Sequence, residues 1–385
     1  MNSEHGVIIS KGRLTINDYL RVVKETDRLP KNDLSPVLHG LFGEVGGIMA
    51  AAKKIKREPD IYSGFDKVIL EEFGDAFWYL CCLSLRIDVD MATVFLNMAN
   101  ETDLKPDIIL GNGSAPMSLN YSAQFDGDFD NALVKLGQLT GEFLSAEYLL
   151  TNSEEKTASF LTVFFHIMEL LQVDFGQVIN INIEKISGRF IRPENSKLPT
   201  FDYDFPEFER LPEYFEVEFV QRTPTQQAMR INGIFVGDPL TDNIEHDDGY
   251  RFHDVFHFSY AAMLHWSPTF RSLLKQKRKS DLKIDEEQDG GRAIVVEEGV
   301  AAWVFTIAKE SNLFKGQKDL SFDMLKNVAQ FVKGYEVERC PLILWEETII
   351  KGFEVFRAIK ANDGGKVVGS RKERTIQFKK IGMSV

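Results

Sequence analysis

Cysteine is scarce in this chain of 385 residues, with three copies, two of them adjacent. An odd count with this spacing argues against a disulfide framework and suits a reducing compartment, so we expect a cytoplasmic protein. The first residues lack the apolar run of a signal peptide. Nor does any stretch reach about 18 uninterrupted apolar residues, so no membrane span is expected.

Positive charge is also in short supply, because 45 Lys and Arg residues face 58 Asp and Glu residues, for a net charge of −13. A chain of this kind lacks the basic field that attracts nucleic acid or anionic membranes, and we expect neither as a partner. A small anion can still bind through a local metal ion or a local basic cluster. The length allows two or three domains with sizeable cores.

Apolar residues recur at helical spacing through the first half of the chain. Leu41, Val45 and Ile48 predict one amphipathic helix, and the run VILEEFGDAFWYL at 68–80 predicts the next. A later set of helices weakly repeats the first, since GLFGEVGGIMAA is echoed by GQLTGEFLSAEY. We therefore predict a helical unit, a linker or insertion, a degenerate second helical unit and a different C-terminal domain, over residues 1–102, 103–127, 128–192 and 193–385.

The C-terminal half begins with a stretch rich in Pro, Phe and acid, which suggests a boundary near residue 191. The segment YFEVEFV alternates like a half-buried strand, and AMRINGIFVGDPL can supply its partner. The chain then becomes helical again, and the basic tail is expected to be loose or an edge strand. The predicted fold class is mainly α, with a small β-hairpin in a mostly helical second domain.

Three acids interrupt the apolar helix at 68–80, namely Glu71, Glu72 and Asp75. Positions three or four apart share one helix face, and Glu44 lies on the preceding helix beside its own apolar stripe. If the two helices pack antiparallel, the carboxylates converge and raise one another's pKa unless a cation lies among them. Hard oxygen ligands suit Mg²⁺ or Mn²⁺. The alternative reading is a solvated acidic face.

These motifs resemble those of the all-α nucleoside triphosphate pyrophosphohydrolases, the MazG-like family. Its members carry a GExGE helix followed by an EE-x-GD-x-x-WYL helix, and this chain has GEVGG at 43–47 and EEFGDAFWYL at 71–80. The resemblance implies Glu44, Glu72 and Asp75 as Mg²⁺ ligands. It also implies hydrolysis of a nucleoside or deoxynucleoside triphosphate between the α and β phosphates, giving a monophosphate and pyrophosphate. Gly47 departs from the pattern by replacing the second acid of the first motif.

The second helical set ends in NINIEKISGRF, which resembles the family's closing N-x-x-K-x-x-x-R helix. The resemblance implies a fused pseudo-dimer, in which the first copy supplies the acids and the metal. The second copy would then supply Asn182, Lys185 and Arg189 to face the phosphates. The alternative for these three is a solvated basic helix end that complements the helix dipole. Because family members usually build the site between subunits, a homodimer or higher homo-oligomer is expected.

The expected chemistry follows from the ligands. A bound metal ion polarises the phosphoryl oxygens and orients a water for in-line attack, and Glu71 or Glu72 is expected to take its proton. Cations from the second copy would offset charge on the leaving pyrophosphate. We also expect Lys54 and Trp78 to contact the substrate.

A second candidate site lies in the C-terminal half, where His253 and His257 are four residues apart with Asp254 beside them. This spacing can chelate one metal ion from a single helix. Further on, Glu297 and Glu298 interrupt a run of Val, Ala and Trp, so at least one carboxylate is expected to be buried with a partner. The alternative is a structural network. The segment looks like the domain often found C-terminal to MazG-like units.

Three functional hypotheses therefore remain open. The first is a Mg²⁺-dependent pyrophosphohydrolase that cleans or depletes the nucleotide pool, for instance in phage defence. The second is a nucleotide-binding sensor whose metal site is incomplete, which Gly47 favours. The third is an oligomerising scaffold, which leaves the acids of the apolar helix unexplained.

Overall fold

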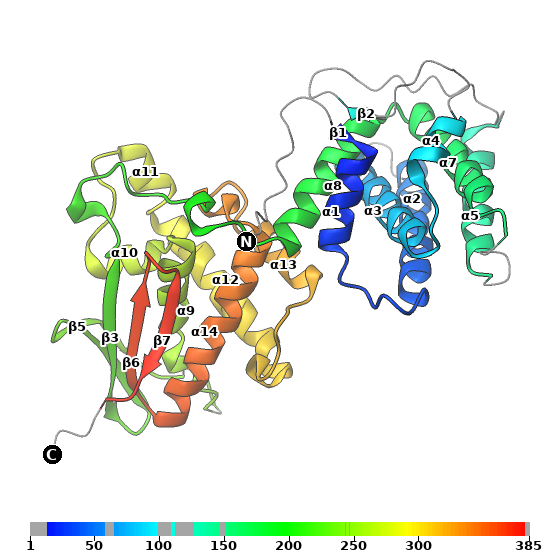
Figure 1. Ribbon diagram of the computed structural model, residues 1–385. Helices are drawn as coiled ribbons and strands as arrows, with labels where there is room; N and C mark the ends of the chain where they lie inside the picture. Colours follow the sequence, from blue (N-terminus) through cyan, green and yellow to red (C-terminus); the bar gives the residue numbers. More distant parts are fainter. Residues whose placement is uncertain are drawn as a thin grey trace, which may run out of the picture. The chain divides into compact units, whose positions relative to one another are not determined.

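A computed structural model of the protein divides the chain into two compact units, 1–191 and 192–385 (Figure 1). The residues that it describes are 14–57, 65–98, 109–111, 127–145, 151–242, 244–245 and 247–381.

Unit 1 is a bundle of α-helices with one small pair of strands. The strand β1 (Leu14–Thr15) pairs antiparallel with β2 (Ile109–Gly111). Apart from β2 and Gly127, the predicted linker at 103–127 lies outside the described residues. The helices are α1 (Ile16–Thr26), α2 (Ser35–Arg57), α3 (Phe65–Arg86), α4 (Met91–Met98), α5 (Phe129–Phe143), α7 (Ser153–Leu170) and α8 (Phe175–Phe190).

Several of these helices begin at a side chain that caps the first turn. Thr15 and Asp18 form a capping box at the start of α1, in which each side chain bonds the backbone N–H of the other. Asp128 and Asp174 accept from backbone N–H groups in the first turns of α5 and α8. Capping of this kind contributes about 1 kcal/mol per helix and sets where each helix begins.

The core of unit 1 is built around the aromatic side chains of α3. Phe73 meets Phe164 edge-on with ring centroids 5.0 Å apart, and Phe77 meets Phe175 in the same way at 5.0 Å. Phe77 also stacks on Tyr19 at 5.3 Å. These contacts bury α3 against α1, α7 and α8, so the acids that flank its aromatic residues are held at the edge of a rigid core.

The predicted mainly helical fold is confirmed. In unit 1, α2 packs against α3, and α5 packs against α7. The relation of these two pairs as copies of one unit, the fused pseudo-dimer, stays a prediction. Among the described helices, none is by itself long and apolar enough to cross a membrane; α7 and α8 meet that test only together, across a bend of 105°.

Unit 2 contains a five-stranded antiparallel sheet in the order β5-β4-β3-β6-β7. The predicted hairpin is present but forms only part of this sheet, because two strands near the end of the chain join it. The second of them lies in the basic tail and is the edge strand that was one of the two expectations for the tail. The turn between them carries charged residues, while Val367 and Ile376 are buried against the helices. The strands are β3 (Tyr214–Thr223), β4 (Gln226–Ile231), β5 (Ile234–Leu240), β6 (Gly365–Ser370) and β7 (Thr375–Lys379).

Helices α9 and α14 pack against β6 and β7 (Figure 1). The helices of unit 2 are α9 (Asp254–Ser259), α10 (Pro268–Leu274), α11 (Leu282–Glu287), α12 (Gly291–Glu310), α13 (Phe322–Phe331) and α14 (Leu342–Asn362). A π-helical turn follows α9 at Tyr260–Leu264, and short 3₁₀ turns lie at Asn195–Lys197, Glu207–Glu209, Tyr250–Phe252, Asn312–Phe314 and Glu336–Arg339.

Buried arginines tie the two ends of unit 2 together. Asp202 accepts from Arg271 at 2.7 Å and from Arg371 at 2.5 Å, and all three side chains are at most 1% exposed. Arg278 pairs with Asp289 at 2.7 Å and is also buried. Arg278 lies in the basic run KQKRKSD at 275–281, whose composition alone predicts a solvated loop; Lys275 and Lys279 are exposed as that predicts, whereas Arg278 is buried and is paired because burial of its charge requires a partner.

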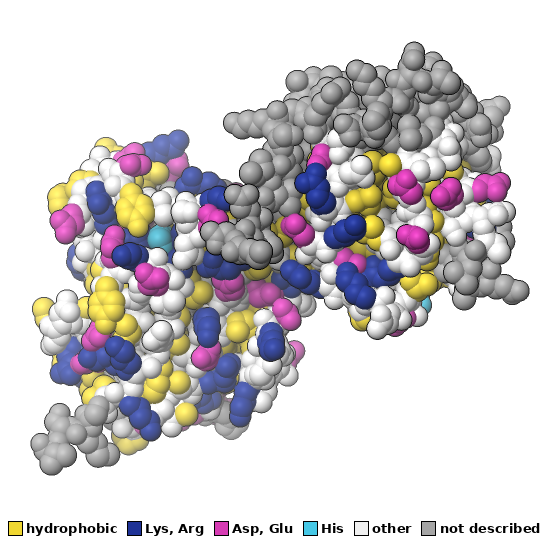
Figure 2. Space-filling model, in the orientation of Figure 1, with side chains coloured by type: hydrophobic (Ala, Val, Ile, Leu, Met, Phe, Trp, Pro, Cys, Tyr) yellow, Lys and Arg dark blue, Asp and Glu magenta, His cyan; other side chains and the backbone are white. Residues whose placement is uncertain are grey.

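Charges of both signs are interspersed on the outer surface. Figure 2 shows Lys and Arg side chains alternating with Asp and Glu side chains across the visible face of each unit. On that face the described residues form no broad field of one sign.

Candidate functional site

Three helices of unit 1 bring the predicted acids and part of the predicted basic set to one place. Helix α2 supplies Glu44, α3 supplies Glu72 and Asp75, and α8 supplies Asn182 and Lys185. The Lys185 ammonium forms an ion pair with Asp75, whose other carboxylate oxygen accepts from Nδ2 of Asn182 at 3.1 Å. Asp75 and Lys185 keep 21% and 15% of their side chains exposed, so the site opens to solvent.

Two glycines allow these helices to approach closely at the site. A Cβ at Gly47 would lie 1.8 Å from a carboxylate oxygen of Glu72, and a Cβ at Gly74 would lie 2.9 Å from Cβ of Asn182. Real Cβ atoms essentially never lie this close to another heavy atom outside their own residue. Because Gly47 has no side chain, the Glu72 carboxylate points into the space that an acidic side chain at position 47 would fill.

Negative charge is in excess among these acids. Burial, followed by the charges of Asp75 and Glu72, raises the pKa of Glu44 to about 7, with Lys185 acting in the opposite sense. A hydrogen bond between the carboxyl groups of Glu44 and Glu72 adds to this rise. The protein alone thus needs a proton near neutral pH to hold the cluster together. A divalent cation can replace that proton, so the donor set fits Mg²⁺ or Mn²⁺.

The three acids are not arranged as a finished cage. Among the described residues, Glu44, Glu72 and Asp75 do not bring ligand atoms within 4.8 Å of one another as a set, whereas His253, Asp254 and His257 do. The physical reason is that Lys185 and Asn182 hold the Asp75 carboxylate. The Lys185 ammonium therefore lies beside Asp75 where a metal ion would otherwise bind.

The remaining predicted residues of unit 1 lie in different surroundings. Trp78 is a core residue with 8% exposure, and its indole N–H donates to Thr26 at 3.1 Å. Lys54 is exposed on α2, and Glu71 is half-buried one residue before Glu72. The Arg189 guanidinium lies over the Phe190 ring at 5.2 Å. Their predicted roles stay predictions, and the position of Trp78 is that of a structural residue.

Two tyrosines near the acids were not singled out from the sequence. The Tyr19 hydroxyl donates to Oδ1 of Asn182 at 2.8 Å and fixes the amide so that its NH₂ group faces Asp75. Burial, together with the charges of Glu44 and Asp75, raises the pKa of Tyr79 to about 12. Tyr79 could have been found from its place in the WYL motif. Tyr19 could not, because it lies in an ordinary amphipathic helix without a motif.

The second predicted site is assembled in unit 2. His253 caps α9 in helical conformation, so its ring and that of His257 are neighbours with centroids 5.7 Å apart. His257 is fully buried, and Asp254 is 5% exposed with Oδ2 lacking any hydrogen-bond partner. Burial raises the pKa of the Asp254 carboxyl, an effect that His253 and His257 oppose.

Helix α12 places two carboxylates against these rings. Glu297 is fully buried, and its Oε1 lies 2.9 Å from Nδ1 of His257. Glu298 lies 3.2 Å from Nε2 of His257 and 3.6 Å from Nε2 of His253. Although burial opposes it, Glu297 raises the pKa of His257 well above its ordinary value, with Glu298 adding to the effect. The sequence-based expectation of a buried carboxylate with a histidine partner is met by Glu297.

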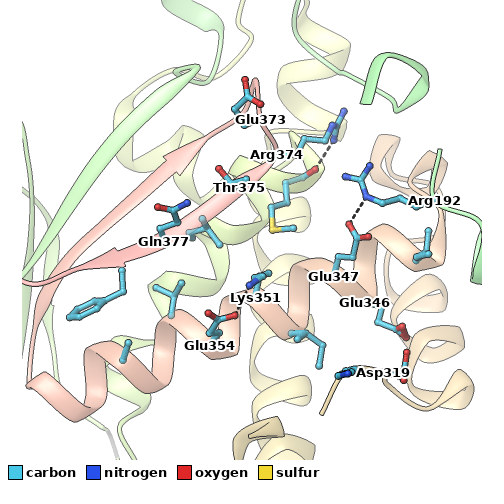
Figure 3. Close-up of a pocket in the computed structure, with 18 residues that line it drawn as sticks. Arg192, Asp319, Glu346, Glu347, Lys351, Glu354, Glu373, Arg374, Thr375 and Gln377 are labelled. Carbon is cyan, nitrogen blue, oxygen red and sulfur yellow. Dashed lines mark hydrogen bonds and ion pairs between the residues drawn. The ribbon is translucent and has the colours of Figure 1, made fainter. Parts of the chain in front are cut away.

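A cavity of about 1060 Å³ lies elsewhere in unit 2, between α14 and β7 (Figure 3). Two ion pairs lie among its charged side chains: Arg192 contacts Glu347 at 2.7 Å, and Lys351 contacts Glu354 at 2.6 Å. None of the predicted site residues lines it. Arg192 and Lys351 thus already have carboxylate partners, which lowers what they offer to a phosphate group.

Comparison with known proteins identifies a family. A family model described as "MazG C-terminal domain" matches residues 196–382. The chain belongs to the MazG-like family. It is also 36% identical over 84 residues to the "Gene 37 protein" of Mycobacterium phage L5, a match that covers 21% of this chain and 74% of that protein. No solved structure matches.

The matched region of this MazG-like chain contains the histidine cluster but not the acids of unit 1. Residues 196–382 include all of α9 and α12, whereas Glu44, Glu72 and Asp75 lie before them. Family membership thus supports a nucleotide-related function in general terms. The case for a particular reaction depends on the geometry of unit 1.

Proposed function

We propose that this MazG-like protein is a Mg²⁺-dependent pyrophosphohydrolase of nucleoside or deoxynucleoside triphosphates that releases a monophosphate and pyrophosphate. One observation carries the proposal. Helices α2, α3 and α8 bring Glu44, Glu72 and Asp75 to one place with Asn182 and Lys185, and the carboxylates there outnumber the cations. A surplus of carboxylate at the edge of a rigid apolar core suits a divalent cation that itself binds phosphate oxygens.

In this proposal Glu44, Glu72 and Asp75 hold the ion. When bound, Mg²⁺ polarises the phosphoryl oxygens and favours formation of the attacking hydroxide. Glu71 is half-buried beside Glu72 on α3 and takes the proton of the attacking water. The Tyr19–Asn182 hydrogen bond keeps the amide N–H group directed at the site, where it can donate to a phosphate oxygen.

Lys185 has two partners in turn. Its ammonium pairs with Asp75. If Asp75 held a divalent ion, the Lys185 ammonium would be available to the departing pyrophosphate. A cation placed where negative charge develops lowers the barrier most, so this exchange converts a structural ion pair into transition-state stabilisation.

The test is incubation of the pure full chain with each ribo- and deoxyribonucleoside triphosphate and Mg²⁺, with chromatography of the products. The proposal expects equal amounts of monophosphate and pyrophosphate, and no release of orthophosphate. EDTA and the variant Asp75→Asn should each remove turnover. Orthophosphate with a diphosphate, or undiminished turnover in Asp75→Asn, would contradict it.

A second candidate is a nucleotide-binding sensor that does not turn its ligand over. Gly47 favours it, because the family's fourth acid is absent and Glu72 points into its space. Nucleotide binding by calorimetry with Mg²⁺, in a protein that produces no pyrophosphate over many hours, would support the sensor and overturn the enzyme.

A further inference from the structure

The cluster of histidines and carboxylates in unit 2 has the construction of a metal site. We propose that His253, His257, Asp254 and Glu298 bind one divalent transition-metal ion, separate from the acids of unit 1. The proposal does not depend on the proposed function, because the residues belong to another unit of the chain.

Each of the two imidazoles is anchored through Nδ1, which leaves Nε2 for a metal ion. Nδ1 of His253 lies 2.9 Å from the carbonyl oxygen of Tyr250, which can only accept a hydrogen bond, so Nδ1 carries a proton. Nδ1 of His257 lies 2.9 Å from Glu297 in the same way. Both Nε2 atoms therefore face away from their anchors and toward Glu298, and a metal ion that binds them would displace any proton they carry.

The ligand atoms converge in a small space. One ligand atom from each of His253, Asp254 and His257 lies within 4.8 Å of the other two. Glu298 reaches both Nε2 atoms, at 3.6 Å for His253 and 3.2 Å for His257. Oδ2 of the buried Asp254 has no hydrogen-bond partner. A buried carboxylate oxygen without a partner is costly, and an ion at this point would satisfy it.

A second layer of contacts holds the site in place. Glu297 is fully buried and accepts from Ser267 Oγ at 2.6 Å and from the backbone N–H of Thr269 at 2.8 Å. Its orientation is set by these bonds, and it in turn orients His257. Tyr250 stacks on the His253 ring with centroids 4.3 Å apart and an interplanar angle of 3°. Carboxylate–histidine pairs of this kind are typical supports of metal ligands.

The donor set selects the class of ion. Two imidazole nitrogens with two carboxylates suit Zn²⁺, Mn²⁺, Fe²⁺ or Co²⁺ and disfavour Mg²⁺ and Ca²⁺, which prefer oxygen ligands. The Glu298 side chain is 39% exposed, so the site opens to solvent at that ligand. An ion bound there keeps access to water or to a small substrate.

The experiment uses the full chain, stripped with chelator and titrated with Zn²⁺ by calorimetry, followed by X-ray absorption of the loaded protein. We expect one Zn²⁺ whose spectrum shows two imidazole ligands at about 2.0–2.1 Å. This signature separates the site from unit 1, where the described candidate ligands are carboxylates.

Variants then assign the ligands. Asp254→Asn and Glu298→Gln keep the shape of each side chain and should each weaken Zn²⁺ binding by more than about 10-fold, and Glu297→Gln by about 10- to 100-fold. His39→Gln, an exposed histidine of α2, is the matched control and should bind as the wild type does. Because Glu298 is partly exposed, Glu298→Gln should fold even if a buried variant fails.

Two results would overturn the proposal. One is a stripped wild-type protein that binds no Zn²⁺, Mn²⁺ or Co²⁺ at millimolar concentration, which would make the cluster a purely structural network. The other is Zn²⁺ bound without imidazole scattering, or bound equally well by Glu298→Gln.

Discussion

The acids of unit 1 and the histidine cluster of unit 2 balance their charge in different ways. In unit 1, burial and the mutual repulsion of carboxylates from two helices raise the pKa of Glu44, and the ammonium of Lys185 offsets part of their charge. In unit 2, Glu298 of α12 faces imidazoles whose other nitrogens are anchored. The first proposed site must rearrange to receive a cation, whereas the second already brings its proposed ligand atoms together. The two proposals thus rest on different observations, surplus negative charge in unit 1 and converging ligand atoms in unit 2.

The largest effect should come from removing a charge at the centre of the unit 1 site. Asp75→Asn keeps the size of the side chain but takes away a proposed ligand, and we expect turnover of triphosphate to fall by about 10³-fold, since several kcal/mol of stabilisation is lost. Glu142→Gln changes the acid of α5 that the proposed repeat pairs with Glu44, and should leave turnover unchanged. Equal losses of turnover in Asp75→Asn and Glu142→Gln would show that the acids proposed as metal ligands are the wrong ones.

The next effect concerns the internal cation. Lys185→Met should lower kcat by about 10²-fold, as expected for loss of one charged donor at a phosphoryl group. The same change leaves Asp75 without its ammonium, so the apparent affinity for Mg²⁺ should rise. Lys24→Met, an exposed lysine of α1, is the control. Steady-state kinetics at varied Mg²⁺ would separate the two effects, and a parallel fall in both would contradict the exchange proposed for Lys185.

A smaller effect is expected from the glycine pair of α2. Gly47→Ala places a methyl group against the Glu72 carboxylate and should reduce turnover by about 10-fold with little change in thermal stability, because a flexible carboxylate can move. Gly46→Ala meets no atom within 4 Å and should raise stability by up to about 1 kcal/mol without affecting turnover. Thermal denaturation and kinetics of the two variants form a matched test.

The dependence on pH should test the role proposed for Glu44. Because its pKa is raised to about 7, the Glu44 carboxyl of the folded protein stays protonated at pH values between its ordinary pKa and about 7. In the unfolded chain the same carboxyl has already lost its proton over this range. Metal-free stability should therefore fall as pH rises through this window. Binding of Mg²⁺ should release about one proton at pH 6 and close to none at pH 8. Calorimetry in buffers of different ionisation enthalpy measures this number; a constant value would exclude Glu44 as a ligand.

The smallest effect is expected at the cavity of unit 2. Lys351 and Glu354 form an exposed pair, 52% and 59% exposed, and Glu354→Gln should change stability by less than about 0.5 kcal/mol. Turnover and Zn²⁺ binding should both stay at wild-type values. A large loss of nucleotide binding in Glu354→Gln would move the substrate site to this cavity.

Spacing along helices predicted the acids of unit 1 but not their partners. Glu44, Glu72 and Asp75 were found because acids beside an apolar stripe are few and regularly placed. That Lys185 reaches Asp75 depends on α8 packing against α3, and the sequence hinted at it only through the family motif. Tyr19 gave no signal, because a hydroxyl at the edge of an apolar face looks the same whether or not it meets an amide.

In unit 2 the i, i+4 histidines were visible, and the burial of one carboxylate followed from acids among apolar residues, although the sequence left its partner open. Two features were not predictable from local patterns. Arg278 lies in a basic run that resembles a surface loop, and only its tertiary partners Asp289 and Glu336 explain its burial. Strand β6 mixes glycine and lysine with valine, so its place in the sheet depends on pairing with β3.

The bond network around Asp202 limits how unit 2 can be dissected. Arg271 comes from the middle of the unit and Arg371 from the hairpin near its end, and both meet a carboxylate that precedes the sheet. A fragment truncated ahead of Arg371 would leave a charged aspartate facing an apolar interior with half its counterions gone. Any recombinant piece meant to retain the histidine cluster should therefore include Asp202 and run through β7, since buried ion pairs join its first and last segments.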